Sequence, residues 1–356
     1  MKKIFYYLAV ATTVLFISCA ESDTTIEIDQ PKETQIVLVL NEGGFNQNNS
    51  SLSKYDLSTG ALSREYFKIK NNRGLGDAGN DMILYGSKLY IVVNVSGTVE
   101  VVDIITGKSL KQIPMKRANG DSKEPRQITA HGGKVYVTSF DDTVSRIDTT
   151  TFNIDATLTT GMDPEGMVIN DGKMYVANSG GLSGFDNTLS VIDLSSFEVI
   201  DEVEVGVNPI NLDIDSRGNI YISALGNYDD KQPVFQKFDP ITDTVTTINE
   251  IPNPGRFAIY GNVAYIITGS FLEPTYSILM YDCVNNKIIS DDFITDDTEI
   301  DVIHSLSIDE NTGDLFIIES DYVIPGSVYC FDIEGKLKYS IDAVGLNPNT
   351  VITFKI

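Results

Sequence analysis

The sequence predicts an all-β protein, a seven-bladed β-propeller built of four-stranded antiparallel blades. Three observations support this fold class. A repeat of roughly 45 residues occurs seven times, each repeat contains short apolar runs separated by turn residues, and no segment shows sustained helical periodicity. Four short strands in a repeat of this length are typical of a propeller blade. The 356 residues are therefore expected to hold one large domain.

An aspartate after the third strand marks every repeat. It recurs at intervals of 43 to 50 residues, at Asp56, Asp103, Asp148, Asp193, Asp239, Asp282 and Asp332. Asp favours the first position of a turn because its carboxylate accepts hydrogen bonds from nearby backbone N–H groups. The residues one and four positions before each Asp are apolar. Such residues point to opposite faces of a strand, so both faces of every blade are expected to be buried.

The two ends of the repeat region predict how the ring closes. The C-terminal PNTVITFKI (348–356) has the pattern of a first strand with nothing after it, whereas the N-terminal repeat begins at its second strand, IVLVL (36–40). Pairing of the C-terminal strand with the N-terminal blade would close the ring and leave neither sheet edge free. Residues 36–356 are expected to form the propeller.

The first residues, MKKIFYYLAVATTVLFISC, have the layout of a signal peptide, because an apolar run too short for a membrane span follows two lysines. Cys19 after a small residue resembles a bacterial lipobox, although Phe16 stands where that motif has Leu. An ordinary secretory signal is the alternative. We expect a signal peptide over residues 1–18, then a lipidated N-terminus and flexible tether over 19–35.

The composition excludes some partners. The net charge of −24 disfavours nucleic acid and anionic lipid headgroups, so membrane contact is expected through the lipid anchor only. Cys283 and Cys330 lie in strand-like stretches and are expected to be buried free thiols. The chain is expected to be a monomer without a metal or cofactor.

The connections between strands differ between the two faces of the predicted ring. Tight glycine turns such as YGSK and HGGK fall on one face. The other face carries longer connections, including residues 41–51, 178–188, 224–234, 268–277, 319–327, 116–127 and 293–304. Long loops on a rigid scaffold are where binding residues concentrate, so this face is the expected binding face.

The long loops combine aromatic rings, which offer contact area at low entropic cost, with amides, which donate and accept hydrogen bonds. Two arginines follow a proline near the axial opening, where an anionic group could be met. The alternative is that some rings fold back over blade edges and the arginines pair with local acids. The candidate ligand-binding residues are Asn41, Phe45, Asn80, Arg126, Phe140, Asn178, Phe185, Asn227, Tyr228, Arg256, Phe271, Tyr276, His304 and Tyr322.

Motifs for catalysis are few. GLGDAG (74–79) satisfies a dinucleotide pattern but precedes a strand and not a helix, so it is interpreted as loop glycine. His304, with Glu165 or Glu299, is a candidate acid–base pair of a lyase or lactonase. No recognisable signature surrounds it, so a non-enzymatic function is expected.

The strands KMYVAN (173–178) and KVYVTS (134–139), each followed by an SVID- or SRID-like strand, resemble the YVTN or YncE-type seven-bladed propellers. The lipobox-like Cys19 together with NEGGFNQNNSSLSKYD (41–56) is similar to the surface propeller lipoproteins of gut Bacteroidetes, including the cobalamin-capturing BtuG type. This resemblance implies a lipid-anchored protein, exposed at the outer-membrane surface, that captures cobalamin or a related corrinoid. It further implies transfer of the ligand to a TonB-dependent outer-membrane transporter.

The resemblance also implies roles for the candidate residues. Aromatic rings would contact the corrin or its benzimidazole, asparagines the amide fringe, and Arg126 or Arg256 the phosphate. His304 is a candidate cobalt ligand. An interaction module for protein or glycan, or an enzyme built on His304, are the alternative functions.

Overall fold

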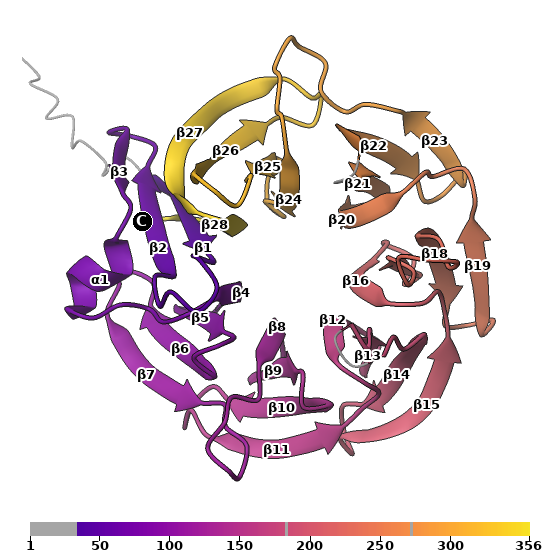
Figure 1. Cartoon of the computed structure of the whole chain (residues 1–356), viewed down its shortest axis with the longest axis horizontal. Helices are drawn as coiled ribbons and strands as arrows, with labels where there is room; N and C mark the ends of the chain where they lie inside the picture. The colour runs from indigo at the N-terminus through magenta and orange to yellow at the C-terminus, as the bar shows by residue number, and fades with distance from the viewer. Residues whose placement is uncertain (1–33, 182–183, 271–272) are drawn as a thin grey trace, which may run out of the picture. The chain divides into compact units, whose positions relative to one another are not determined.

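Seven four-stranded antiparallel sheets stand around a central axis, as Figure 1 shows. The computed structural model describes residues 34–181, 184–270 and 273–356. The predicted signal peptide, Cys19, nearly all of the tether and Phe271 lie outside the described residues. Thr34–Ile356 forms one compact unit, and the sheets within it confirm the predicted seven-bladed propeller.

Blade 1 joins the two ends of the described chain. From the axis outward its strands are β28 (Pro348–Lys355), β1 (Gln35–Asn41), β2 (Ser51–Asp56) and β3 (Ala61–Ser63). Strand β28 is antiparallel to β1, with Ile36 opposite Phe354 and Leu40 opposite Thr350. The predicted closure of the ring by the C-terminal strand is confirmed.

The other blades follow in chain order, each from its innermost to its outermost strand (Figure 1). Blade 2 consists of β4 (Gly79–Tyr85), β5 (Lys88–Val93), β6 (Thr98–Asp103) and β7 (Ser109–Pro114). Blade 3 consists of β8 (Pro125–His131), β9 (Lys134–Ser139), β10 (Thr143–Asp148) and β11 (Ile154–Thr159). Blade 4 consists of β12 (Pro164–Asn170), β13 (Lys173–Asn178), β14 (Thr188–Asp193) and β15 (Glu198–Glu204).

The same order continues around the rest of the ring. Blade 5 consists of β16 (Pro209–Ile214), β17 (Ile220–Ala224), β18 (Val234–Asp239) and β19 (Thr244–Ile248). Blade 6 consists of β20 (Pro254–Tyr260), β21 (Val263–Ser270), β22 (Glu273–Asp282) and β23 (Lys287–Ser290). Blade 7 consists of β24 (Ile303–Ile308), β25 (Leu315–Glu319), β26 (Pro325–Phe331) and β27 (Leu337–Leu346).

One short helix, α1 (Tyr66–Asn71), lies between blades 1 and 2 and was not expected from the sequence. Its six residues are too few for helical periodicity to show. Tyr66 and Phe67 are buried in the apolar cluster between these blades, and Asn72 ends the helix in the left-handed conformation. Tertiary packing therefore stabilises a helix that is too short to be stable by itself.

The core is divided among the spaces between blades. The described residues form seven apolar clusters, one between each pair of neighbouring blades. Side chains alternate along each inner strand, so Leu38 packs toward blade 2 while Val37 and Val39 pack toward blade 7. The residues one and four before each repeated aspartate likewise reach different clusters, as Val102 and Val99 do. This confirms the expected burial of both blade faces.

Each repeated aspartate fixes the turn after its third strand. Asp193 shows the pattern: its Oδ1 accepts hydrogen bonds from the backbone N–H of Ser195 (2.9 Å) and Ser196 (2.8 Å). The Ser195 hydroxyl and these N–H groups lower the pKa of Asp193 to about 2. The other six aspartates accept backbone N–H bonds in the same way, which confirms their predicted role as turn residues.

Cys283 and Cys330 are buried and free, as expected. Within the described ranges no helix is long and apolar enough to cross a membrane. We use "long-loop face" for the face carrying loops 42–50, 179–187, 225–233 and 320–324, and "short-turn face" for the opposite face. The difference between the two faces that the sequence predicted is confirmed for these loops. The prediction of a long loop at residues 268–277 is wrong, because β21 and β22 extend into it and pair Thr268 with Ser277.

Candidate functional site

A cavity of about 570 Å³ opens on the long-loop face at the axis of the ring. Blades 3 to 7 all contribute to its wall. Seven of the predicted residues line it: Arg126, Phe140, Tyr228, Arg256, Tyr276, His304 and Tyr322. The structure thus brings half of the fourteen candidate residues together at one cavity on the expected face.

A repeated backbone irregularity shapes this cavity. In all seven blades the pairing of the innermost strand with its neighbour shifts register at the end nearest the long-loop face. In six blades the residue just before this strand is a non-glycine in the left-handed conformation, as Glu124, Asp163 and Asn208 are. Register shifts of this kind redirect side chains and are common beside functional sites. Here the redirected residues surround the axis.

Arg126 follows the proline that opens β8 and is held by its neighbours. Its guanidinium donates to Glu165 Oε1 at 2.8 and 3.0 Å and to Asn80 Oδ1 at 2.7 Å, and it lies 4.6 Å from the centre of the Phe140 ring. Asn80 Nδ2 donates in return to the Arg126 carbonyl oxygen. These contacts occupy the guanidinium, so Arg126 chiefly joins blades 2, 3 and 4 at the edge of the cavity.

Arg256, unlike Arg126, is not held by hydrogen bonds to neighbouring side chains. It lines the cavity and also the narrow axial channel beneath it, and it is partly buried. It has no hydrogen bond or ion pair with any residue in the described part of the chain. The positive charge of Arg256 affects two ionisable groups. It contributes to the lowered pKa of His304, and it opposes the burial that raises the pKa of Glu42. Arg256 is therefore the guanidinium best placed to meet an anionic ligand.

His304 begins β24 and contacts the rim loop of blade 7. Its Nδ1 lies 2.9 Å from the Tyr322 hydroxyl, and the two rings meet edge-on with centres 5.1 Å apart. Burial, reinforced by the charge of Arg256, lowers the pKa of His304 to about 4. The imidazole is therefore neutral at physiological pH.

The alternative acid–base pair is not assembled in this structure. Glu165 is engaged by Arg126 and Glu299 is exposed, so among the described residues His304 has Tyr322 and not a carboxylate as its hydrogen-bond partner. The enzyme alternative therefore gains no support from this geometry.

Exposed aromatic rings stand above the cavity. Tyr228 is 76% exposed and meets Phe185 edge-on at 6.0 Å, while its hydroxyl accepts a bond from Asn208. Tyr322 is 52% exposed. Asn227 holds its own loop, since its Oδ1 accepts backbone N–H bonds from two following residues. These rings form an apolar rim around a polar, cationic interior.

Phe45 lies on the ordered loop 42–50. Asp77 is buried and its two carboxylate oxygens accept the backbone N–H groups of Asn46 (3.0 Å) and Asn48 (2.8 Å), while Asn49 Oδ1 accepts that of Gly44. Asn46 and Asn48 are both left-handed. The loop therefore presents Phe45, which is 73% exposed, on a fixed backbone.

Two of the predicted residues that do not line the cavity are buried within their own blades. Asn41 and Asn178 end the second strand of their blades and are fully buried. The Asn41 amide donates to two serine hydroxyls of β2, and the Asn178 amide donates to Thr188 and Ser190 of β14. Both therefore hold neighbouring strands of one blade together instead of facing a ligand.

The sequence reasoning missed the amides and acids of the inner strands. Asn349 was not proposed as a site residue, and Glu165 was considered only as a catalytic acid. One sequence signal could have found several of them: an Asn, Asp or Glu followed by Pro opens five of the seven innermost strands. The residues directly after that Pro face the axis, as Arg126 and Glu165 do.

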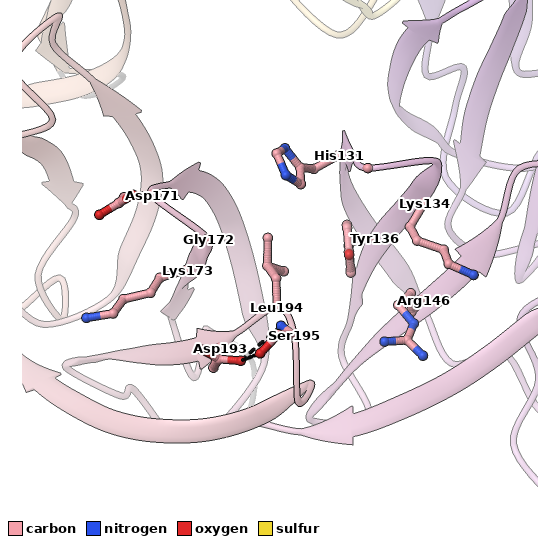
Figure 2. Close-up of a pocket in the computed structure, with 11 residues that line it drawn as sticks. His131, Lys134, Tyr136, Arg146, Asp171, Gly172, Lys173, Asp193, Leu194 and Ser195 are labelled. Atoms are coloured by element: carbon pink, nitrogen blue, oxygen red, sulfur yellow. Dashed lines mark hydrogen bonds between the residues drawn. The ribbon is translucent and has the colours of Figure 1, made fainter.

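A second cleft, of about 490 Å³, lies on the short-turn face between blades 3 and 4. Figure 2 shows His131, Tyr136 and Leu194 around it, with Lys134 and Arg146 to one side. Lys134 is paired with Asp148 and Asp155, and Arg146 also contacts Asp155. The charges of Lys134 and Arg146 are therefore matched within blade 3, whereas Lys173 of blade 4, which also lines the cleft, forms no ion pair with a described residue.

The structure is thus a seven-bladed propeller with an open cavity on its long-loop face. The chain belongs to the DUF5074 family, a domain family of unknown function whose model matches residues 36–313. Nothing among curated proteins matches it.

The similarity to solved structures supports the fold and nothing beyond it. Hydrazine synthase of Kuenenia stuttgartiensis is similar over 72% of this chain and 77% of its own, at 16% identity and a TM-score of 0.58. The computationally designed Ika8 protein is similar over 74% of this chain and 87% of its own, at 11% identity and a TM-score of 0.51.

Proposed function

We propose that the protein captures cobalamin or a related corrinoid on its long-loop face and passes it to a TonB-dependent outer-membrane transporter. The observation that carries this proposal is the Arg256 guanidinium, which lies partly buried in a cavity with an aromatic rim and forms no hydrogen bond or ion pair with a described residue. A partly buried cation without a protein partner favours an anionic ligand group.

The chemistry of a corrinoid fits this arrangement. A corrin is broad and apolar on its faces, is fringed with amides, and carries one phosphodiester in its nucleotide loop. In this proposal the ring rests on the rim aromatics Tyr228 and Tyr322, at the mouth of the cavity of about 570 Å³. The phosphodiester would then reach Arg256 within the cavity.

The proposed location rests on the N-terminal sequence. A signal peptide followed by Cys19 supports lipid anchoring, and the polar segment after it supports a tether long enough to hold the propeller clear of the membrane. We propose the outer surface of the outer membrane, with capture on the exposed face and release toward the transporter. In this function the protein would resemble the BtuG-type propellers.

Arg256→Gln tests the proposal most sharply, with Arg64→Gln as the matched control. Arg64 is exposed at the outer edge of blade 1, so its loss changes the net charge equally but leaves the cavity intact. A hydrogen bond to a charged group contributes about 1.5–3 kcal/mol, which corresponds to roughly 10- to 150-fold in affinity. Calorimetry should show this loss for cyanocobalamin with Arg256→Gln alone. Equal affinity of both variants would contradict the role of Arg256.

A further inference from the structure

Beneath the cavity, the innermost strands enclose an axial channel of about 150 Å³. Side-chain amides from four blades line it, those of Asn80, Gln127, Asn211 and Asn349. Arg256 lines both the channel and the cavity above, so the two spaces meet at its side chain. A ligand group that passes Arg256 would enter a chamber walled largely by neutral polar groups.

Two of these amides have polar atoms without a hydrogen-bond partner among the described residues. The Oδ1 of Asn349 is buried and accepts no hydrogen bond, while its Nδ2 donates to the carbonyl oxygens of Gly79 (2.9 Å) and Asn80 (3.0 Å). These two bonds fix which way the amide points. The side-chain amide of Gln127 makes no hydrogen bond to any described residue. A buried acceptor left without a partner is destabilising, so a donor is expected to occupy the channel beside Asn349 Oδ1.

The charges around the channel select the kind of donor. Asp81 also lines it, and its two oxygens accept backbone N–H groups of Met82 and Ile128. An anionic group pushed past Arg256 would approach this carboxyl, whereas a cationic group would first have to pass the guanidinium. A neutral group with both an N–H donor and a carbonyl acceptor can satisfy Asn349 and Gln127 together.

We propose that the axial channel is a second subsite that takes a short neutral arm ending in a primary amide, while Arg256 holds the anionic group of the same ligand. A water occupies roughly 30 Å³ in the liquid, so the channel has room for an arm of a few heavy atoms. The identity of the whole ligand rests on the proposed function, whereas the amide chemistry of the arm rests on the channel itself.

Gln127→Met is the first test, because it keeps the length of the side chain and removes its donor and acceptor. Gln35→Met at the start of β1, on the short-turn face, is the matched control. Cyanocobalamin should bind Gln127→Met about fivefold more weakly, as expected for one hydrogen bond of about 1 kcal/mol. Gln35→Met should bind as the unaltered protein does. Unchanged cyanocobalamin affinity in Gln127→Met would overturn the subsite and leave the proposed function standing.

Propionamide corresponds to the proposed arm without the rest of the ligand. Its binding therefore distinguishes failure of the subsite from failure of the proposed function. Its titration into isotope-labelled protein should shift the side-chain amide resonances of Gln127 and Asn349, and those of Gln35 should stay in place. If cyanocobalamin does not bind but propionamide gives these shifts, the proposed function fails and the subsite stands. Absence of the shifts at high millimolar propionamide would overturn the subsite.

Discussion

His304→Gln is predicted to remove a pH-dependent loss of stability that the unaltered protein shows between pH 7 and pH 5. Burial and Arg256 lower the pKa of His304 from 6.5 to about 4 in the folded state. Below pH 6.5 the unfolded chain binds a proton that the folded protein does not, so stability falls as the pH falls toward 4. Above pH 6.5 both states are neutral and the full contribution is present.

The size of this effect follows from the two pKa values. A difference of 2.5 between 6.5 and about 4 corresponds to about 3.4 kcal/mol once both states are protonated. At pH 5 the folded imidazole is still mostly neutral, and the same linkage gives about 2 kcal/mol. Tyr322 and Glu42, whose pKa values are raised by burial, are common to both proteins, so their contributions largely cancel in the comparison.

Urea unfolding of both proteins at pH 7 and pH 5 measures this difference, with His131→Gln as the control. The chain holds only two histidines, so each variant removes one of them and keeps the other. Between pH 7 and pH 5, the free energy of unfolding of the unaltered protein should fall by about 2 kcal/mol more than that of His304→Gln. Parallel losses in the two proteins would refute the burial of His304 beside Arg256.

Three further predictions concern packing, the rim loop and the thiols. Phe235→Ala should lower the free energy of unfolding by about 3–5 kcal/mol in calorimetry, since its buried ring packs on three others. Asp77→Ala should speed amide exchange in loop 42–50 at least roughly tenfold, because two hydrogen bonds to a carboxylate are lost; unchanged exchange would contradict its role. Cys283 and Cys330, with pKa values raised by burial to about 11 and 12, should react with a thiol reagent only after unfolding.

The fold could be predicted because its signals are local and repeated. The aspartate of each third strand and the apolar residues before it occur seven times, so each repeat supported the interpretation of the others. Closure through β28 followed from counting strands at the two ends. Helix α1 could not be predicted, since six residues show no period and their stability depends on Tyr66 and Phe67 reaching a core made by other strands.

The site could be predicted only in part because its decisive contacts join distant residues. Arg126 and Arg256 look alike in sequence, yet Arg126 pairs with Glu165 from the next blade and Arg256 forms no hydrogen bond or ion pair with a described residue. Asn41 and Asn178 stand beside long loops but point into their own blades. Register shifts in the innermost strands decide which side chains face the axis, and only the recurring Pro hints at them.

Calorimetric titration of the purified protein with cyanocobalamin, repeated with cobinamide, tests the central claim most directly. The account predicts tight one-to-one binding of cyanocobalamin and a marked loss of affinity for cobinamide, because cobinamide lacks the phosphodiester that Arg256 would hold. Absence of heat and of any spectral change at high micromolar cyanocobalamin would contradict capture of a corrinoid by this propeller.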